Sequence, residues 1–137
     1  MAETAQRFEE RVLIVEDDSD YRRYLELRLQ HEGATTWLCG TGETALDAVA
    51  EFKPTVVITD IGLPGIDGLT VCRRLRADPQ HRRLPILLLS SADHSAEVGE
   101  VVGLGLIWYL RKGSDWQVTA RTLRNLVGRA REVPLAS

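Results

Sequence analysis

Apolar residues gather in five short runs along the chain, and longer amphipathic stretches separate them. The runs are rich in Val, Ile and Leu. They are too short for core helices and are typical of strands buried on both faces. One run alternates loosely, as expected of a strand nearer the edge of a sheet. The predicted strands are 11–15, the alternating 34–39, 55–60, 85–89 and 106–110.

The stretches between these runs have the periodicity of helices with one buried face. Ser19 is the expected N-cap of the first helix and Asp67 that of the third. Ser114 and Gln117 have the spacing of a capping box at the start of the last. The predicted helices are 19–31, 42–52, 67–77, 93–104 and 114–131.

The predicted helix 93–104 contains Gly99 and Gly103. Each glycine inside a helix costs about 1 kcal/mol relative to alanine. This helix is therefore predicted to be the weakest of the five.

Strands and helices alternate from residue 11 to residue 131. This order predicts one doubly wound α/β domain, with a parallel sheet, right-handed crossovers and helices on both faces. Residues 1–10 are predicted to be a flexible leader and residues 132–137 a short C-terminal tail.

Composition excludes several classes of protein. The net charge of -3 gives no sign of nucleic-acid binding or membrane attachment, and no apolar run is long enough to span a bilayer. The polar residues 1–10 do not resemble a signal peptide. Cys39 and Cys72 fit no metal-binding spacing, so we predict two buried, reduced thiols in a cytoplasmic protein.

Polar residues stand at the carboxyl ends of four predicted strands: Glu16 with Asp17, then Asp60, Ser90 and Lys112. Parallel strands bring these ends to one edge of the sheet, where sites in open α/β sheets lie. Three carboxylates in a small space favour a hard divalent cation such as Mg²⁺. A single acid there could simply cap a helix, but the whole set favours a site.

These segments together resemble the receiver domain of two-component response regulators, over about residues 10–130. The resemblance rests on Asp60 and on the segments VLIVEDD (12–18), LPGIDG (63–68), LPILLLS (84–90) and GLIWYLRK (105–112). It implies the flavodoxin-like (βα)5 fold with strand order 2-1-3-4-5.

The resemblance implies that Asp60 accepts a phosphoryl group from a histidine kinase or a histidine phosphotransfer protein. Asp17, Asp60 and the backbone carbonyl of Gly62 would bind Mg²⁺, with Mn²⁺ as an alternative, and Glu16 would act through metal-bound water.

By the same resemblance, Lys112 would pair with the phosphoryl oxygens. Ser90 would hydrogen-bond to the phosphoryl group, and Tyr109 would change its packing. The signal would leave through the face formed by 93–104, 106–110 and 114–131, to a protein partner or in a homodimer. Nucleic acid would not be bound directly.

The chain departs from the family pattern at several positions. Glu16 stands where Asp is commoner, and Ser90 where Thr is commoner. Gly113 replaces the usual Pro after the lysine, which puts a cis peptide there in doubt. Trp108 is predicted to be exposed on the fifth strand, at a partner surface or in local packing.

Three other functions are weighed against the switch. An aspartyl phosphatase similar to the haloacid dehalogenase group needs a second Asp two residues after the nucleophile, where this chain has Gly62. A receiver-fold interaction module that is never phosphorylated would not need the acid, hydroxyl and lysine set. We therefore expect a switch with no enzymatic activity beyond Mg²⁺-dependent self-phosphorylation and slow self-dephosphorylation. A flavodoxin-like cofactor site is disfavoured, because the acids at 16–18 would repel a phosphate.

Overall fold

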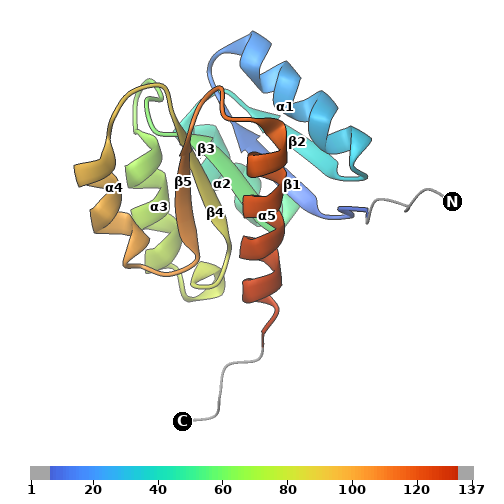
Figure 1. Ribbon diagram of the computed structural model, residues 1–137. Coiled ribbons are helices and arrows are strands. Elements are labelled where there is room, and N and C mark those ends of the chain that lie inside the picture. Colours follow the sequence, from blue (N-terminus) through green and yellow to red (C-terminus); the bar gives the residue numbers. More distant parts are fainter. Residues whose placement is uncertain (1–6, 133–137) are drawn as a thin grey trace, which may run out of the picture.

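The computed structural model describes residues 7–132, which form one parallel sheet between two layers of helices (Figure 1). The sheet order is β2-β1-β3-β4-β5, which confirms the predicted doubly wound fold. The strands are β1 (Arg11–Val15), β2 (Thr35–Cys39), β3 (Val56–Asp60), β4 (Ile86–Ser90) and β5 (Ile107–Arg111). The helices are α1 (Ser19–His31), α2 (Gly42–Phe52), α3 (Gly68–Ala77), α4 (Ser95–Val102) and α5 (Trp116–Ala130), with a 3-10 turn, η1 (Pro79–His81).

Two apolar cores fill the space between the sheet and its helices. Successive strand residues point to opposite faces, so Val57 packs toward α2, α3 and α4, while Ile58 packs toward α1 and α5. Every residue of β3 and β4 is buried. Cys39 and Cys72 are buried free thiols, as predicted.

The parallel register brings the carboxyl ends of the strands together. Val15 of β1 pairs with Thr59 of β3, Asp60 of β3 with Leu89 of β4, and Ser90 of β4 with Arg111 of β5. The residues that end or follow these strands therefore lie along one edge of the sheet.

Two predicted helix caps are wrong by one residue. Asp18, not Ser19, caps α1, and its carboxylate accepts hydrogen bonds from the backbone N–H groups of Asp20 and Tyr21. Asp115, not Ser114, caps α5. In both cases a carboxylate occupies the position, because an ionised acceptor suits the positive end of a helix.

The domain begins earlier than predicted. Residues 1–6 lie outside the described part of the chain, but 7–10 are packed in place. Phe8 is buried, and its backbone N–H donates to the carbonyl of Glu32 at 2.7 Å. The Arg131 guanidinium lies 2.6 Å from the carboxylate of Glu10. Glu10, the last residue before the predicted start of the domain, is therefore also held in place. The predicted tail is described only at Glu132.

Helix α4 is shorter than the predicted 93–104 and is the shortest α-helix between residues 7 and 132. Its N-cap, His94, makes no capping hydrogen bond to the helix backbone, and its ring contacts the Glu97 carboxylate instead, at 2.7 Å. Only Val98 and Val101 of α4 are buried. Among the helices described, none is long and apolar enough to cross a membrane.

Candidate functional site

The residues predicted at the strand ends lie at one edge of the sheet. Glu16 and Asp17 follow β1 directly, Asp60 ends β3, Ser90 ends β4 and Lys112 follows β5. Each strand end fixes the backbone of its residue, so these positions depend on the register of the sheet and not on a flexible loop.

Lys112 joins two of the carboxylates. Its Nζ lies 2.6 Å from Oε1 of Glu16 and 3.1 Å from Oδ2 of Asp60. The Lys112 side chain is 17% exposed, whereas the Glu16 side chain is 1% exposed. Burial lowers the pKa of Lys112, but its hydrogen bonds to Glu16 and Asp60 outweigh that effect and raise the pKa above its ordinary value. The ammonium is therefore held in its charged form.

Backbone groups fix the other atoms of Asp60. Oδ1 accepts a hydrogen bond from the backbone N–H of Gly62 at 3.1 Å. Gly68 packs directly on the Asp60 carbonyl, and a Cβ at Gly68 would collide with that oxygen. The sequence pattern places Gly68 at the start of a predicted helix and gives it no contact with Asp60. Its close packing on Asp60 depends on a contact that spacing alone does not reveal.

Glu16 is buried and tied to the start of α1. Its Oε2 accepts a hydrogen bond from the backbone N–H of Asp18 at 3.1 Å, and its carbonyl accepts from Arg22 at 2.6 Å. Burial raises the pKa of Glu16, against the opposing effect of Lys112. Glu16, the longer acid at this position, thus contacts the Lys112 ammonium directly.

The acidic cluster fits a hard divalent cation. One carboxylate oxygen each from Glu16, Asp17 and Asp60 lie within 4.8 Å of one another. Three carboxylates face a single ammonium, which leaves excess negative charge and donors made only of oxygen. Mg²⁺ and Mn²⁺ suit such donors. The predicted role of the Gly62 carbonyl stays a prediction.

Ser90 and Tyr109 contact residues outside the acidic cluster. The Ser90 hydroxyl donates to the carbonyl of Ala92, whose N–H donates back to it at 3.2 Å. Tyr109 is half-buried, and its ring lies 5.9 Å from that of Trp108. Trp108 is 50% exposed, as predicted. The peptide between Lys112 and Gly113 is trans.

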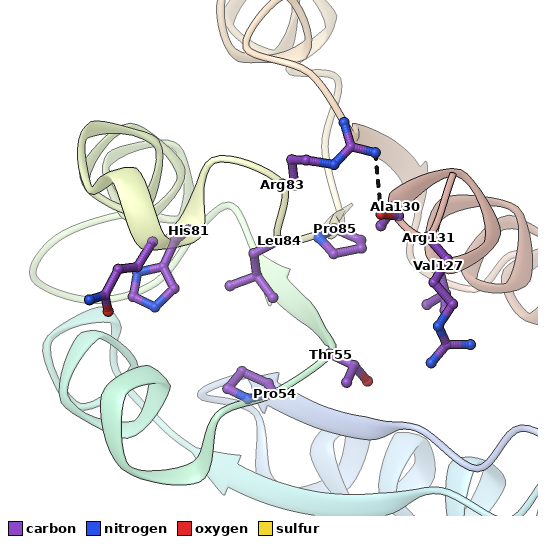
Figure 2. A pocket seen from close by; sticks show the side chains of 10 residues that line it. Pro54, Thr55, His81, Arg83, Leu84, Pro85, Val127, Ala130 and Arg131 are labelled. Atoms are coloured by element: carbon purple, nitrogen blue, oxygen red, sulfur yellow. Dashed lines mark hydrogen bonds between the residues drawn. The ribbon is translucent and has the colours of Figure 1, made fainter. Parts of the chain in front are cut away.

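A hollow lies at the edge of the sheet opposite the acidic cluster, between the start of β3, the segment before β4 and the end of α5 (Figure 2). Its two arginines are already engaged. Arg83 donates to the carbonyls of Arg129 and Ala130 at 3.0 and 3.2 Å, and Arg131 pairs with Glu10. Neither arginine of this hollow is therefore free to bind an anionic ligand, given the contacts within residues 7–132.

Comparisons with known proteins agree with this geometry. The family model described as the response regulator receiver domain matches residues 12–124. The transcriptional regulatory protein AfsQ1 of Streptomyces coelicolor is 41% identical over 93 residues, which cover 68% of this chain and 39% of that protein. The DNA-binding response regulator MtrA of Mycobacterium tuberculosis is 40% identical over 95 residues, which cover 69% and 40%. The chain thus spans about two fifths of the length of these relatives.

Solved structures show the same fold. A putative response regulator from Chloroflexus aurantiacus has a TM-score of 0.81 and 35% identity, with 89% of this chain and 100% of that chain covered. The BeF3-activated receiver domain of RstA from Klebsiella pneumoniae has a TM-score of 0.78 and 30% identity, covering 89% and 99%. With the family match over most of its length, this chain belongs to the receiver domain family of two-component response regulators.

Proposed function

We propose that this protein is a phosphorylation-dependent switch that accepts a phosphoryl group on Asp60 from a histidine kinase or a histidine phosphotransfer protein. The observation that carries the proposal is the contact of Lys112 with both Asp60 and Glu16. Phosphoryl transfer depends on alignment and on charge neutralisation, and this cluster offers a fixed nucleophile with a cation beside it.

The transfer conserves atoms and charge. A carboxylate oxygen of Asp60 attacks the phosphorus of a phosphohistidine, a P–O bond forms, and the P–N bond breaks. The imidazole leaves with the bonding electron pair and takes a proton from solvent. The hydrogen bond from the Gly62 N–H to Oδ1 holds the carboxylate in one orientation during the attack.

Mg²⁺ would be held by carboxylate oxygens of Asp17 and Asp60, with the Gly62 carbonyl, and by Glu16 through water. When bound, it supplies positive charge that offsets the charge of the phosphoryl oxygens. Lys112 then moves from its carboxylate partners to a phosphoryl oxygen. Its flexible four-carbon stem and three donors allow this exchange.

Ser90 would transmit the change. A new phosphoryl group brings about -1.5 to -2 charges and strong acceptor oxygens, and the Ser90 hydroxyl would leave Ala92 to donate to one of them. Because that hydroxyl now closes the turn before α4, its departure would free residues 91–94 to move. Tyr109 would repack in response.

The signal would leave through the face formed by α4, β5 and α5, to a protein partner or a second copy of the chain. Relatives named as transcriptional or DNA-binding regulators are longer than this chain, and the match covers about two fifths of their length. Any output of that kind lies outside the residues that form this fold, and the receiver itself is proposed not to bind nucleic acid.

Incubation with Mg²⁺ and acetyl phosphate tests the proposal. We expect a base-labile adduct of one phosphoryl mass on the wild type, none on Asp60→Asn, and strong loss in Asp17→Asn. Asp18→Asn is the matched control, because it also removes a carboxylate beside the site but keeps a good N-cap residue. It should be phosphorylated like the wild type.

An absence of adduct on the wild type, with partner binding unchanged in Asp60→Asn, would favour the interaction module that is never phosphorylated. An adduct that survives Asp60→Asn would place the acceptor elsewhere.

A further inference from the structure

The Lys112 ammonium has an aromatic neighbour as well as its two carboxylates. Its Nζ lies 5.1 Å from the centroid of the Tyr21 ring. This is within the roughly 6 Å at which a ring face attracts a cation. Tyr21 lies in the first turn of α1 and is half-buried. The sequence pattern places Tyr21 in a helix and indicates no role for it in the site.

Neighbouring rings hold Tyr21 in place. Tyr24 stacks on it with centroids 5.6 Å apart and an interplanar angle of 29°. Trp116, the first residue of α5, packs edge-on against Tyr24 at 6.3 Å. The Arg28 guanidinium lies over both Tyr24 and Trp116, at 5.7 and 5.8 Å. The contacting rings of Tyr21, Tyr24 and Trp116 therefore connect α1 to α5. Tyr21, at one end of this row, lies beside the Lys112 ammonium.

The phenol of Tyr21 also faces the backbone that follows Lys112. Burial raises the pKa of Tyr21, and the nearby backbone N–H of Gly113 opposes that rise. Gly113 has a φ of +85°, a conformation that favours glycine. The ring of Tyr21 thus lies against the Lys112 ammonium, and its phenol lies near the backbone of Gly113.

We propose that Tyr21, braced by Tyr24 and Trp116, is a positioning residue for Lys112. Its ring retains the ammonium at the site while Lys112 exchanges carboxylate oxygens for phosphoryl oxygens. A ring face attracts the cation without tight directionality, so the three N–H donors of Lys112 stay available to oxygen partners. The exchange of partners rests on the function proposed above, whereas the contact itself does not.

The contact can be measured without phosphorylation. The chain has two lysines, Lys53 and Lys112, so lysine-selective isotope labelling gives two sets of side-chain NMR signals. The ring current of Tyr21 should shift the ε-methylene protons of Lys112 away from those of the exposed Lys53. Tyr21→Phe should keep this shift, and Tyr21→Leu should move the Lys112 signal toward that of Lys53. Unchanged Lys53 and backbone signals would show that each variant is folded.

A double-mutant cycle tests the positioning role. With Mg²⁺ and saturating acetyl phosphate, Tyr21→Leu should slow the maximal phosphorylation rate about three- to tenfold, the range that a partly exposed cation–π contact allows. Tyr21→Phe should stay within about twofold of the wild type by the same reasoning. In a Lys112→Met background, Tyr21→Leu should add no further loss. A purely structural role would instead reduce the rate in both backgrounds.

The two hypotheses fail in different ways. No adduct on the wild type, with the ring-current shift of Lys112 present, overturns the proposed function and keeps the contact. An unchanged Lys112 signal in Tyr21→Leu overturns the role of Tyr21, whatever the rate of phosphorylation. Equal losses from Tyr21→Leu in both backgrounds overturn it as well.

Discussion

Substitution of Lys112 by methionine removes the cation that pairs with both Glu16 and Asp60. It leaves three carboxylates whose oxygens lie within 4.8 Å of one another. Two unit charges at that separation repel by about 3.5 kcal/mol at an effective dielectric constant near 20. Removal of one partner from a buried ion pair costs about 3–5 kcal/mol. Because Lys112 is 17% exposed, we expect a loss of about 3 kcal/mol, at the lower end of that range.

For a domain of this length, such a loss lowers the melting temperature by about 6–12 °C. The assay is thermal unfolding at neutral pH without divalent cations. Lys53→Met is the matched control, because Lys53 is exposed at the end of α2 and should change stability by no more than about 0.5 kcal/mol. Mg²⁺ should restore much of the loss in Lys112→Met, because the cation replaces the missing positive charge.

Protonation of Glu16 should also reduce the loss, so the difference between Lys112→Met and the wild type should shrink as the pH falls toward 4.5. Two results would contradict this reasoning. Lys112→Met could be as stable as Lys53→Met, or neither Mg²⁺ nor acid could reduce its loss of stability. Either result would show that Lys112 does not act by offsetting the repulsion among the three carboxylates.

Three further predictions concern the surroundings of the site. Because the pKa of Glu16 is raised above 4.5 in the folded state, its ionisation destabilises the fold as the pH rises through that folded-state pKa. Glu16→Gln should therefore gain stability relative to the wild type as the pH rises above 4.5 in metal-free denaturant titrations, and a constant difference would contradict this. Gly68→Ala should cost about 1–3 kcal/mol and slow phosphorylation, because its Cβ would displace the Asp60 carbonyl; Gly62→Ala, which has open space, is the control and should lose little stability. Gly99→Ala should stabilise the protein by about 0.5–1 kcal/mol, since nothing lies near its added Cβ in α4, and a loss in chemical denaturation would show that the glycine is needed there.

The convergence of Asp60, Ser90 and Lys112 on one edge could be predicted because it follows from two simple regularities. Short apolar runs identify buried strands, and parallel strands place their carboxyl ends together. The contact of Lys112 with Glu16 and Asp60 was not predicted for the unphosphorylated protein. The resemblance implies only a phosphoryl partner for Lys112. Without a phosphoryl group, the ammonium pairs with the carboxylates of Glu16 and Asp60.

Other features depend on side chains that meet from distant parts of the sequence. Phe8 stands alone in a polar segment, so no periodicity marked it as buried. Tyr21 reaches Lys112 only because α1 begins at the edge of the sheet where β5 ends. Glycine is required at position 68 by its packing on Asp60 and not by its place at the start of α3. Each of these contacts is a property of the folded chain, and local patterns do not encode it.

Direct mapping of the phosphoryl acceptor tests the central claim. The wild type is phosphorylated with acetyl phosphate and Mg²⁺, the acyl phosphate is reduced with borohydride, and the peptides are sequenced by mass spectrometry. Reduction converts an aspartyl phosphate to homoserine, so we predict homoserine at position 60 and unmodified Asp17. Homoserine at another aspartate, or none at any position in protein that binds Mg²⁺, would contradict the assignment of Asp60 as the acceptor.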